Sequence, residues 1–348
     1  MKSGKPTIKE IAARTGVSIG TVHRAIYGKE GVGEETRKRI LEEVERMNYH
    51  VDEAASSLKR KALTIAVVLP RTQGEDRFYF RGIWEGVKQA AADLGKYKVE
   101  FRYFESEYSL DKMANELQRI YDTILDDIDG LITISDSEDS NEWIARFYKQ
   151  GVTVVLVSSY GRVENYFCSI KVEHEKAGRL AAEYMRDTCS TRPGKLLVLT
   201  GNRDIFSNRR YADAFLTQMK EYDAGRGIIC VDGFGYDEIN GRCREILAGE
   251  QIAGIFACNA RNTYTMCGIL QDMGQEQVFF IGTDVFYELK PYFDRGVINA
   301  SIYQYNREQG KRAVEILYQY LISGSRERGR EYLPIGLVLR NNSEYFMN

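Results

Sequence analysis

The sequence lacks the features that mark membrane, secreted and disulfide-bonded proteins. No apolar run approaches the roughly 18 residues that a membrane-spanning helix needs; the candidate LTIAVVL, at 63–69, has the length of a strand. The opening residues, MKSGKPTIKE, contain no apolar segment or cleavage site of a secretory signal. Six cysteines are scattered without C-x-x-C spacing. We therefore expect buried, reduced thiols in a cytoplasmic protein that makes no membrane contact.

Motifs of common nucleotide-binding and hydrolytic enzymes are also missing. Neither G-x-G-x-x-G nor G-x-x-x-x-G-K-[ST] follows the first apolar run, so no phosphate-binding loop is predicted. Of the three histidines, His23 and His50 lie near the N-terminus, and nothing like G-x-S-x-G accompanies His174. No Cys/His cluster has metal-ligand spacing. We predict no catalytic residues, no metal, no cofactor and no enzyme activity.

Positive charge is concentrated in the N-terminal segment. The whole chain has a net charge of −2, yet residues 1–61 hold 13 Lys/Arg against 9 Asp/Glu. This segment is therefore +4 and the remainder is −6. A basic head on an acidic body suggests a polyanionic partner for the head.

Three short helices are predicted in this basic segment. Thr7 and Glu10 form a capping box, Gly16 fits the left-handed position after a helix, and Ser18 is a good N-cap for the next helix. A third helix begins near Glu34. The residues expected to face inward are Ile8, Ile11, Ala12, Val22, Ala25, Ile26, Ile40, Leu41, Val44 and Met47. Two helices joined by the tight turn at 15–17 indicate a helix-turn-helix, and an ordinary αα-hairpin is the alternative.

From residue 63 onward, short β-rich runs alternate with longer amphipathic segments. The ten runs are LTIAVVLP, KVEFRYF, GLITIS, TVVLVS, CSIKV, KLLVLT, GIICVDG, GIFACN, VFFIGTD and INASIYQ. This alternation predicts βαβ units, and ten strands are too many for one small parallel sheet. We therefore expect two doubly wound subdomains that bind ligand at the carboxyl ends of their strands. The segment SGSRERGRE, at 323–331, is predicted to be a polar loop.

Residues 6–63 resemble the DNA-binding head of the LacI/GalR family of bacterial repressors. The resemblance is carried by IKEIAARTGVSIGTVHRAI (8–26), VGEETRKRI (32–40), NY (48–49) and AASSL (54–58). It implies that Ile19, Gly20 and Arg24 read bases, whereas Ser18, Thr21 and His23 face phosphates. An arginine at this place can bind guanine bidentately or contact phosphate alone. Since Gly20 offers no side chain, the operator is expected to differ from those of better-known relatives.

Residues 53–61, EAASSLKRK, resemble the hinge helix of the same family. The resemblance implies that small residues such as Ala55 let two copies approach closely. It also implies that Leu58 inserts into a minor-groove base step and that Lys59 neutralises a phosphate. The alternative is a plain linker helix. This chain has Val51 where the family commonly has proline.

The body resembles periplasmic-binding-protein-type sugar receptors across residues 62–340. The effector-binding residues that this resemblance implies are Phe78, Tyr79, Phe80, Ser158, Arg209, Phe234, Asn259, Asp284 and Gln304. Such a mixture suits a neutral polyol, whose hydroxyls pair with planar polar groups and whose C–H faces lie on aromatic rings. The alternatives are structural: a salt bridge for Arg209, a helix cap for Asp284, and core packing for Phe78 or Phe234. A modified sugar, a sugar acid bound through Arg209, and a polyol all remain open.

Together these features predict a fold class and a domain plan. An all-α helix-turn-helix head (1–52) and a hinge (53–61) precede an α/β effector and dimerisation domain (62–348). The latter has two doubly wound parallel-sheet subdomains, at about 62–163 with 302–330 and about 164–301 with 331–342. The resemblance implies a homodimeric, sugar-responsive repressor of a near-palindromic double-stranded operator. Alternatives are a non-sugar effector such as a purine-like co-repressor, an activator role, a transport receptor and an enzyme.

Overall fold

The computed structural model describes residues 6–26, 30–47, 49, 61–160, 163–324 and 329–347. The predicted hinge residues Ala55, Leu58 and Lys59 lie outside this described part of the chain.

The head contains three helices, α1 (Ile8–Thr15), α2 (Ile19–Ile26) and α3 (Glu34–Arg46). The predicted capping box is present: the Glu10 amide donates to the Thr7 hydroxyl, and the Thr7 amide donates to the Glu10 carboxylate at 2.8 Å. Gly16 ends α1 with φ 69°, in the left-handed region. The small core of the head is made by Ile11, Ala12, Val22, Ala25 and Ile40.

Leu41 does not belong to that core. Its side chain is 43% exposed, contrary to the prediction that it faces inward. The reason is helical geometry: Ile40 already points into the core, and the next residue along a helix is turned by about 100°.

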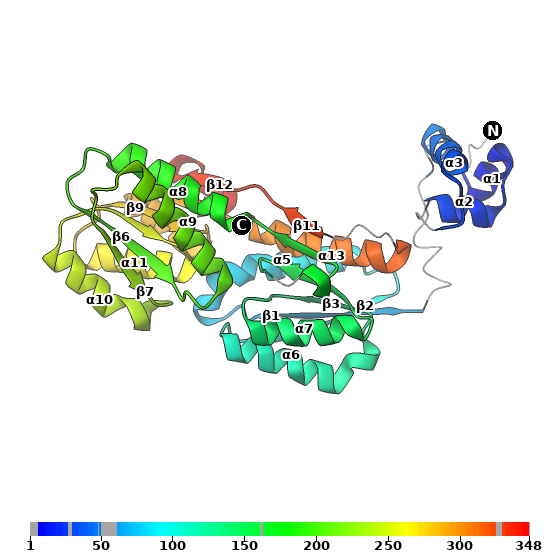
Figure 1. Cartoon of the computed structure of the whole chain (residues 1–348), viewed down its shortest axis with the longest axis horizontal. Coiled ribbons are helices and arrows are strands. Elements are labelled where there is room, and N and C mark those ends of the chain that lie inside the picture. Colours follow the sequence, from blue (N-terminus) through cyan, green and yellow to red (C-terminus); the bar gives the residue numbers. More distant parts are fainter. Residues whose placement is uncertain are drawn as a thin grey trace.

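The body has two six-stranded sheets, each covered by helices on both faces (Figure 1). The first sheet has the order β11-β5-β4-β3-β1-β2 and the second β12-β10-β9-β8-β6-β7. The strands of the first are β1 (Leu63–Pro70), β2 (Val99–Ser106), β3 (Gly130–Thr133), β4 (Thr153–Val157), β5 (Cys168–Lys171) and β11 (Gly329–Tyr332). Those of the second are β6 (Lys195–Gly201), β7 (Ile228–Asp232), β8 (Ile252–Ala257), β9 (Phe279–Thr283), β10 (Ala300–Tyr303) and β12 (Gly336–Leu339).

Neighbouring strands are parallel except for the antiparallel pair β10 and β12. The helices of the body are α5 (Arg77–Asp93), α6 (Leu110–Ile124), α7 (Glu138–Lys149), α8 (His174–Cys189), α9 (Phe206–Tyr222), α10 (Tyr236–Gly249), α11 (Ala260–Asp272), α12 (Lys290–Arg295) and α13 (Asn306–Ser323). The first lobe is the first sheet with α5, α6, α7 and α13, and the second lobe is the second sheet with α8 to α12. This architecture confirms the predicted fold class.

The chain passes between the lobes three times: after β5, after β10, and between β11 and β12. The first crossing comes later than predicted. The segment 168–171 was assigned to the second subdomain, but as β5 it pairs with β4 in the first sheet. Likewise, β10 at 300–303 lies wholly in the second sheet, so the predicted start of the returning segment at 302 falls inside a strand. The sequence pattern locates strands, whereas their pairing partners depend on the tertiary fold.

Two strands were not predicted. Strand β11 occupies residues 329–332, inside the predicted polar loop, and pairs with β5 at the edge of the first sheet. Its residues are half-buried or exposed in alternation, so it has no apolar run to reveal it. Strand β12 likewise lies at a sheet edge, beside β10. An edge strand can be mostly polar because only one of its sides is paired.

Close packing of α13 on α5 holds the returning segment on the first lobe. A Cβ atom at Gly86 would overlap the carbonyl oxygen of Arg307, and one at Gly310 would overlap that of Ile83. The two helices can therefore approach this closely only because each has glycine at the contact. No helix in the described part of the chain has both the length and the apolar character to cross a bilayer.

Candidate functional site

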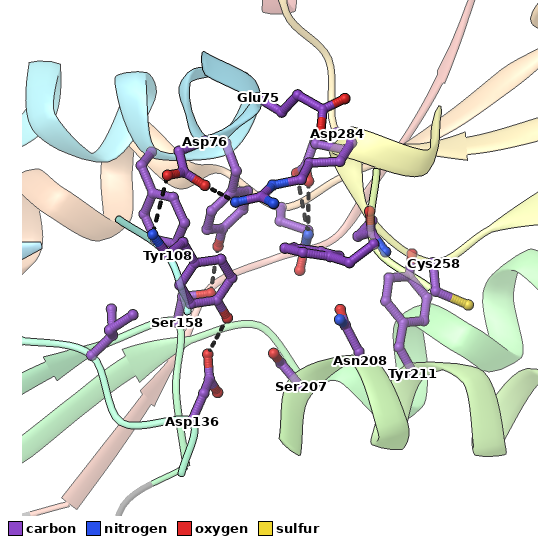
Figure 2. Close-up of a pocket in the computed structure, with 18 of the residues that line it drawn as sticks. Glu75, Asp76, Tyr108, Asp136, Ser158, Ser207, Asn208, Tyr211, Cys258 and Asp284 are labelled. Carbon is purple, nitrogen blue, oxygen red and sulfur yellow. Dashed lines mark hydrogen bonds and ion pairs between the residues drawn. The ribbon is translucent and has the colours of Figure 1, made fainter. Parts of the chain in front are cut away.

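A cavity with an empty volume of about 590 Å³ lies between the two lobes, at the carboxyl ends of the strands (Figure 2). Its lining residues come from the segments that follow the strands of both sheets, as expected for a doubly wound fold. They are Glu75, Asp76, Tyr79, Phe80, Tyr108, Ile134, Asp136, Ser158, His174, Ser207, Asn208, Tyr211, Phe234, Cys258, Asn259, Ala260, Arg261, Asp284 and Gln304.

Seven of the nine predicted effector residues line this cavity. They are Tyr79, Phe80, Ser158, Phe234, Asn259, Asp284 and Gln304. The two exceptions, Phe78 and Arg209, both lie on helices next to residues that do face the cavity. In each case the side chain points to a different side of the helix from the neighbouring residues that line the cavity.

Phe78 is a core residue. It is 2% exposed, and its ring lies 4.6 Å from that of Phe286 and 4.6 Å from that of Tyr264. Both partners belong to the second lobe, so Phe78 packs across the lobe boundary beside the cavity rather than within it. The core alternative is therefore the correct one for this residue.

Arg209 is exposed and does not line the cavity. Helix α9 turns Ser207, Asn208 and Tyr211 toward the cavity, and Arg209 lies between these positions on another side of the helix. Its guanidinium instead lies 5.3 Å from the ring centre of Phe206. The prediction that Arg209 is the pocket arginine is therefore wrong.

The arginine in the cavity is Arg261, in the first turn of α11. It forms an ion pair with Asp76, whose side chain is almost completely buried. The other oxygen of Asp76 accepts from the Tyr108 amide at 3.1 Å. The Arg261 guanidinium also lies 4.1 Å from the ring centre of Phe234, and burial lowers its pKa to about 10. Sequence reasoning missed Arg261, although it stands only two residues after the predicted Asn259.

The ion pair joins the two lobes, because Asp76 precedes α5 and Arg261 begins α11. Two further contacts join the lobes close to this ion pair. The Tyr236 amide donates to Glu75 at 3.3 Å, and Arg77 pairs with Glu288 at 3.0 Å. These contacts join the two lobes through protein atoms alone.

Asp136 and Tyr108 form a second polar contact in the first lobe. The Tyr108 hydroxyl donates to Oδ2 of Asp136 at 2.6 Å, whereas Oδ1 is buried without a hydrogen-bond partner. Desolvation by burial is the main cause that raises the pKa of Asp136 to about 6, against the lowering effect of the hydrogen bond from Tyr108. No sequence signal distinguished Asp136 from the other acids that follow β3.

Asp284 and Gln304 face the cavity from the second lobe and the second crossing. The Gln304 amide nitrogen donates to both oxygens of Asp284, at 3.2 and 3.1 Å. Because a carboxylate only accepts, this contact fixes the orientation of the amide, and Oε1 of Gln304 is left buried without a partner. Burial raises the pKa of Asp284 to about 8. Asp284 also has φ 69°, a left-handed conformation that is rare outside glycine and often found at binding sites.

Asn259 has both a structural and a binding role available to it. Its Oδ1 caps α11 by accepting from the Asn262 amide at 2.9 Å, while its Nδ2 is buried without a partner. The Nδ2 atoms of Asn208 and Asn259 converge on Gly201, where a Cβ atom would lie 2.7 Å from each. Gly201 also has φ 73°. A side chain there would displace both amides from the cavity.

The exposed face of α2 in the head is the second candidate site. Ser18 caps this helix by accepting from the Thr21 amide at 3.1 Å. Val22 and Ala25 are buried, whereas Ile19, Gly20, His23 and Arg24 are exposed, Ile19 by 44%. These exposed positions are spaced three or four residues apart and therefore share one face.

Comparison with known proteins adds the family. The model for bacterial regulatory proteins of the lacI family matches residues 7–52, and the periplasmic binding protein domain matches residues 65–325. The head of the chain is a lacI-family domain. The body is a periplasmic-binding-protein domain, so the predicted family is confirmed.

Several transcriptional regulators are similar in sequence to this chain. Catabolite control protein A of Streptococcus mutans is 28% identical over 174 residues, which are 50% of this chain and 49% of that protein. The ribose operon repressor of Lactococcus lactis is 23% identical, covering 96% and 97% of the two chains. The transcriptional repressor PurR of Aliivibrio salmonicida is 26% identical, covering 92% and 94%. The matches to the catabolite control proteins thus span about half of their length.

A solved structure supports the same fold. A LacI transcriptional regulator from Bacteroides fragilis superimposes with a TM-score of 0.72 at 14% identity, covering 82% of this chain and all of that one.

Among the described residues, no group of three or more His, Cys, Asp and Glu side chains could hold a metal ion.

Proposed function

We propose that this lacI-family regulator is a homodimeric repressor that binds a near-palindromic operator and responds to a sugar. The cavity between the lobes is the observation that carries the sugar response. Its buried Asp136 Oδ1, Gln304 Oε1 and Asn259 Nδ2 atoms have no protein partner. A buried polar group is stable only when it is hydrogen-bonded, so these atoms define where a polar ligand binds.

The head supports DNA binding through the exposed face of α2. In a helix-turn-helix, the second helix enters the major groove with its early residues toward the bases. Here the early turn presents Ile19 and Gly20, and Arg24 follows one turn later on the same face. Ser18 and Thr21 lie at the start of the helix, where hydroxyls and backbone amides bind phosphate. His23 extends this polar face.

Ring geometry favours a sugar over a purine. Three ring pairs around the cavity are edge-to-face: Tyr79 with Phe80 at 89°, Phe80 with Tyr108 at 66°, and Tyr108 with Phe234 at 66°. These rings pack edge-to-face on one another, so no pair of them forms a parallel slot that could hold a flat base on both faces, whereas a sugar ring needs only one aromatic face and hydrogen bonds around its rim. The polar atoms of this cavity come from both lobes and so surround the ligand.

Control of DNA binding follows from the position of the cavity. A ligand held by Asp136 in the first lobe and by Asn259 in the second fixes the angle between the lobes. In the chain, the predicted hinge segment at 53–61 directly precedes the first lobe, so a change in this angle would alter the separation of the hinges in a dimer. The coupling is reciprocal: a ligand that weakens operator binding is itself bound more weakly by the operator complex. We propose a regulatory role rather than catalysis.

The experiment measures operator binding with the full chain and DNA fragments from its own genomic neighbourhood. Arg24→Ala is expected to lower affinity for the preferred fragment by about 1–3 kcal/mol, while affinity for random DNA falls far less. Arg39→Ala removes an exposed charge from α3 and serves as the matched control, which should affect both duplexes equally. A protein that prefers no fragment over random DNA, with or without sugars, would refute the proposal. Sedimentation of the complex tests the dimer.

A further inference from the structure

The charges in the cavity indicate what kind of sugar it accepts, and this inference rests on the proposed function. Three buried carboxylates line the cavity: Asp76, Asp136 and Asp284. Among the described lining residues there is one guanidinium, that of Arg261, and no lysine. Arg261 is already paired with Asp76. Asp136 and Asp284 therefore have no cationic side chain in hydrogen-bond contact.

The other cations near the cavity are engaged elsewhere. Arg210 forms an ion pair with Glu175 at 2.5 Å. The Lys171 ammonium donates to the Ser159 carbonyl at 3.4 Å and lies 3.4 Å from the ring centre of Tyr160. It influences Asp136 only at longer range. Arg71 lies 3.6 Å from Asp76 and 3.9 Å from Glu107. An anionic ligand would thus meet the acidic side chains of Asp136 and Asp284, while each of these cations already contacts a protein acceptor.

The buried polar atoms without partners also favour a ligand that is rich in hydrogen-bond donors. Asp136 is 6% exposed and Gln304 is 5% exposed, and each leaves a buried acceptor oxygen without a donor. Asp284 receives one amide nitrogen shared between its two oxygens, which leaves lone pairs on both. Among the buried side-chain atoms of the described lining residues, one donor without a partner stands against these acceptors, Nδ2 of Asn259. The cavity is therefore short of donors and of positive charge.

An ammonium group supplies both the hydrogen-bond donors and the positive charge that the cavity lacks. It has three N–H donors, no acceptor and one positive charge. The oxygens of Asp284 and Oε1 of Gln304 lie on adjoining groups, so a single ammonium can bind both. Asn259 and Asp136 then suit hydroxyls of the same ring, and Phe80 and Phe234 its C–H faces. We propose that the effector is an amino sugar whose protonated amine binds at Asp284 and Gln304.

The test compares sugars that differ at one group. Glucosamine, galactosamine and mannosamine are titrated into the full chain beside their parent hexoses, N-acetyl derivatives and uronic acids, with thermal shift and calorimetry as readouts. At least one amine should bind 10-fold or more tightly than its parent and its N-acetyl derivative, and uronic acids should bind most weakly. Equal binding of the parent sugar, tighter binding of the acid, or no response to any amine overturns the inference.

Variants locate the amine. Asp284→Asn keeps the shape of the side chain but cannot become a carboxylate when an ammonium binds beside it, so the preference for amine over parent sugar should disappear. Asp93→Asn, on the exposed end of α5, is the matched control and should keep the preference. A preference that survives in Asp284→Asn contradicts the placement at Asp284. If a neutral sugar binds and releases operator DNA, the proposed function stands and this inference fails. If an amine binds without affecting DNA, the proposed function fails instead.

Discussion

Asp284 makes the stability of this protein depend on pH in a predictable direction. The residue is 1% exposed, and its carboxylate accepts from a single amide group, that of Gln304. Burial raises its pKa from 3.8 to about 8. Asp284→Asn replaces the carboxylate with a neutral group of the same shape, which can still accept from Gln304. The variant therefore isolates the effect of the buried charge.

The sign follows from proton binding. Between pH 4 and pH 8 the folded protein without effector keeps the proton on Asp284, whereas the unfolded chain has lost it. An ammonium bound beside Asp284 would favour its charged form and lower this pKa, so the measurement is made without effector. Stability consequently falls as the pH rises through this window. A difference of about four pH units at 1.36 kcal/mol each sets an upper figure on the order of 5 kcal/mol. The neighbouring tyrosines, Tyr79, Tyr211 and Tyr303, have pKa values raised by burial and do not titrate in this window.

The assay is thermal unfolding of the full chain at pH 5, 6, 7, 8 and 9, followed by circular dichroism. The stability of Asp284→Asn relative to the wild type should rise from pH 5 to pH 8 and then level off. A gain of about 3 kcal/mol corresponds to roughly 5 °C in Tm. Asp136 and Lys171 titrate in both proteins, so their contributions cancel in the difference. The control Asp93→Asn should follow the wild type at every pH. A constant difference between Asp284→Asn and the wild type would show that Asp284 is ionised throughout.

Three further outcomes test other parts of the structure. Gly201→Ala should reduce effector affinity by 10-fold or more because the new methyl group displaces the amide of Asn208, whereas Gly241→Ala, where a Cβ atom has open space, should leave titration calorimetry unchanged. Arg209→Ala should leave the effector titration unaltered, and Asn208→Ala should weaken it; the opposite order would return Arg209 to the site. Gly310→Ala should lower Tm markedly, because its methyl group overlaps the backbone of α5, and an unchanged Tm would contradict the packing described.

The fold was largely predictable from the sequence because its signals are local. Ten apolar runs of strand length alternate with helices, and all ten are strands of the two sheets. The caps at Thr7 and Ser18 and the left-handed Gly16 depend on a few adjacent residues. The missed strands, β11 and β12, are edge strands. Strand β11 is mostly polar and gives no apolar signal, whereas β12 contains the short apolar run LVL, which the prediction left unassigned. Which sheet a strand joins is a long-range property, and for this reason the boundary after residue 163 was wrong.

The site was predictable where a residue directly follows a strand. Ser158, Asn259, Asp284 and Gln304 all do so, and a parallel sheet brings the ends of its strands to one edge. Residues on helices were less certain, because an error of one position rotates a side chain by about 100°. For this reason the predicted cavity residue Arg209 lies on another side of α9, whereas its neighbours Ser207 and Asn208 face the cavity.

Two kinds of contact can join the lobes: ion pairs between protein side chains, and hydrogen bonds that an effector makes inside the cavity. Two ion pairs join the lobes through protein atoms alone, Asp76 with Arg261 and Arg77 with Glu288. The unpartnered oxygens of Asp136 and Gln304 lie inside. An effector that forms hydrogen bonds with these interior atoms stabilises this arrangement of the lobes. The two ion pairs between the lobes are present without it. Its influence on DNA is then limited to its difference in affinity between lobe arrangements. A 99:1 reversal of a 1:99 equilibrium requires a difference of about 10⁴-fold in effector affinity, and the interior hydrogen bonds are the contacts through which an effector can supply that difference.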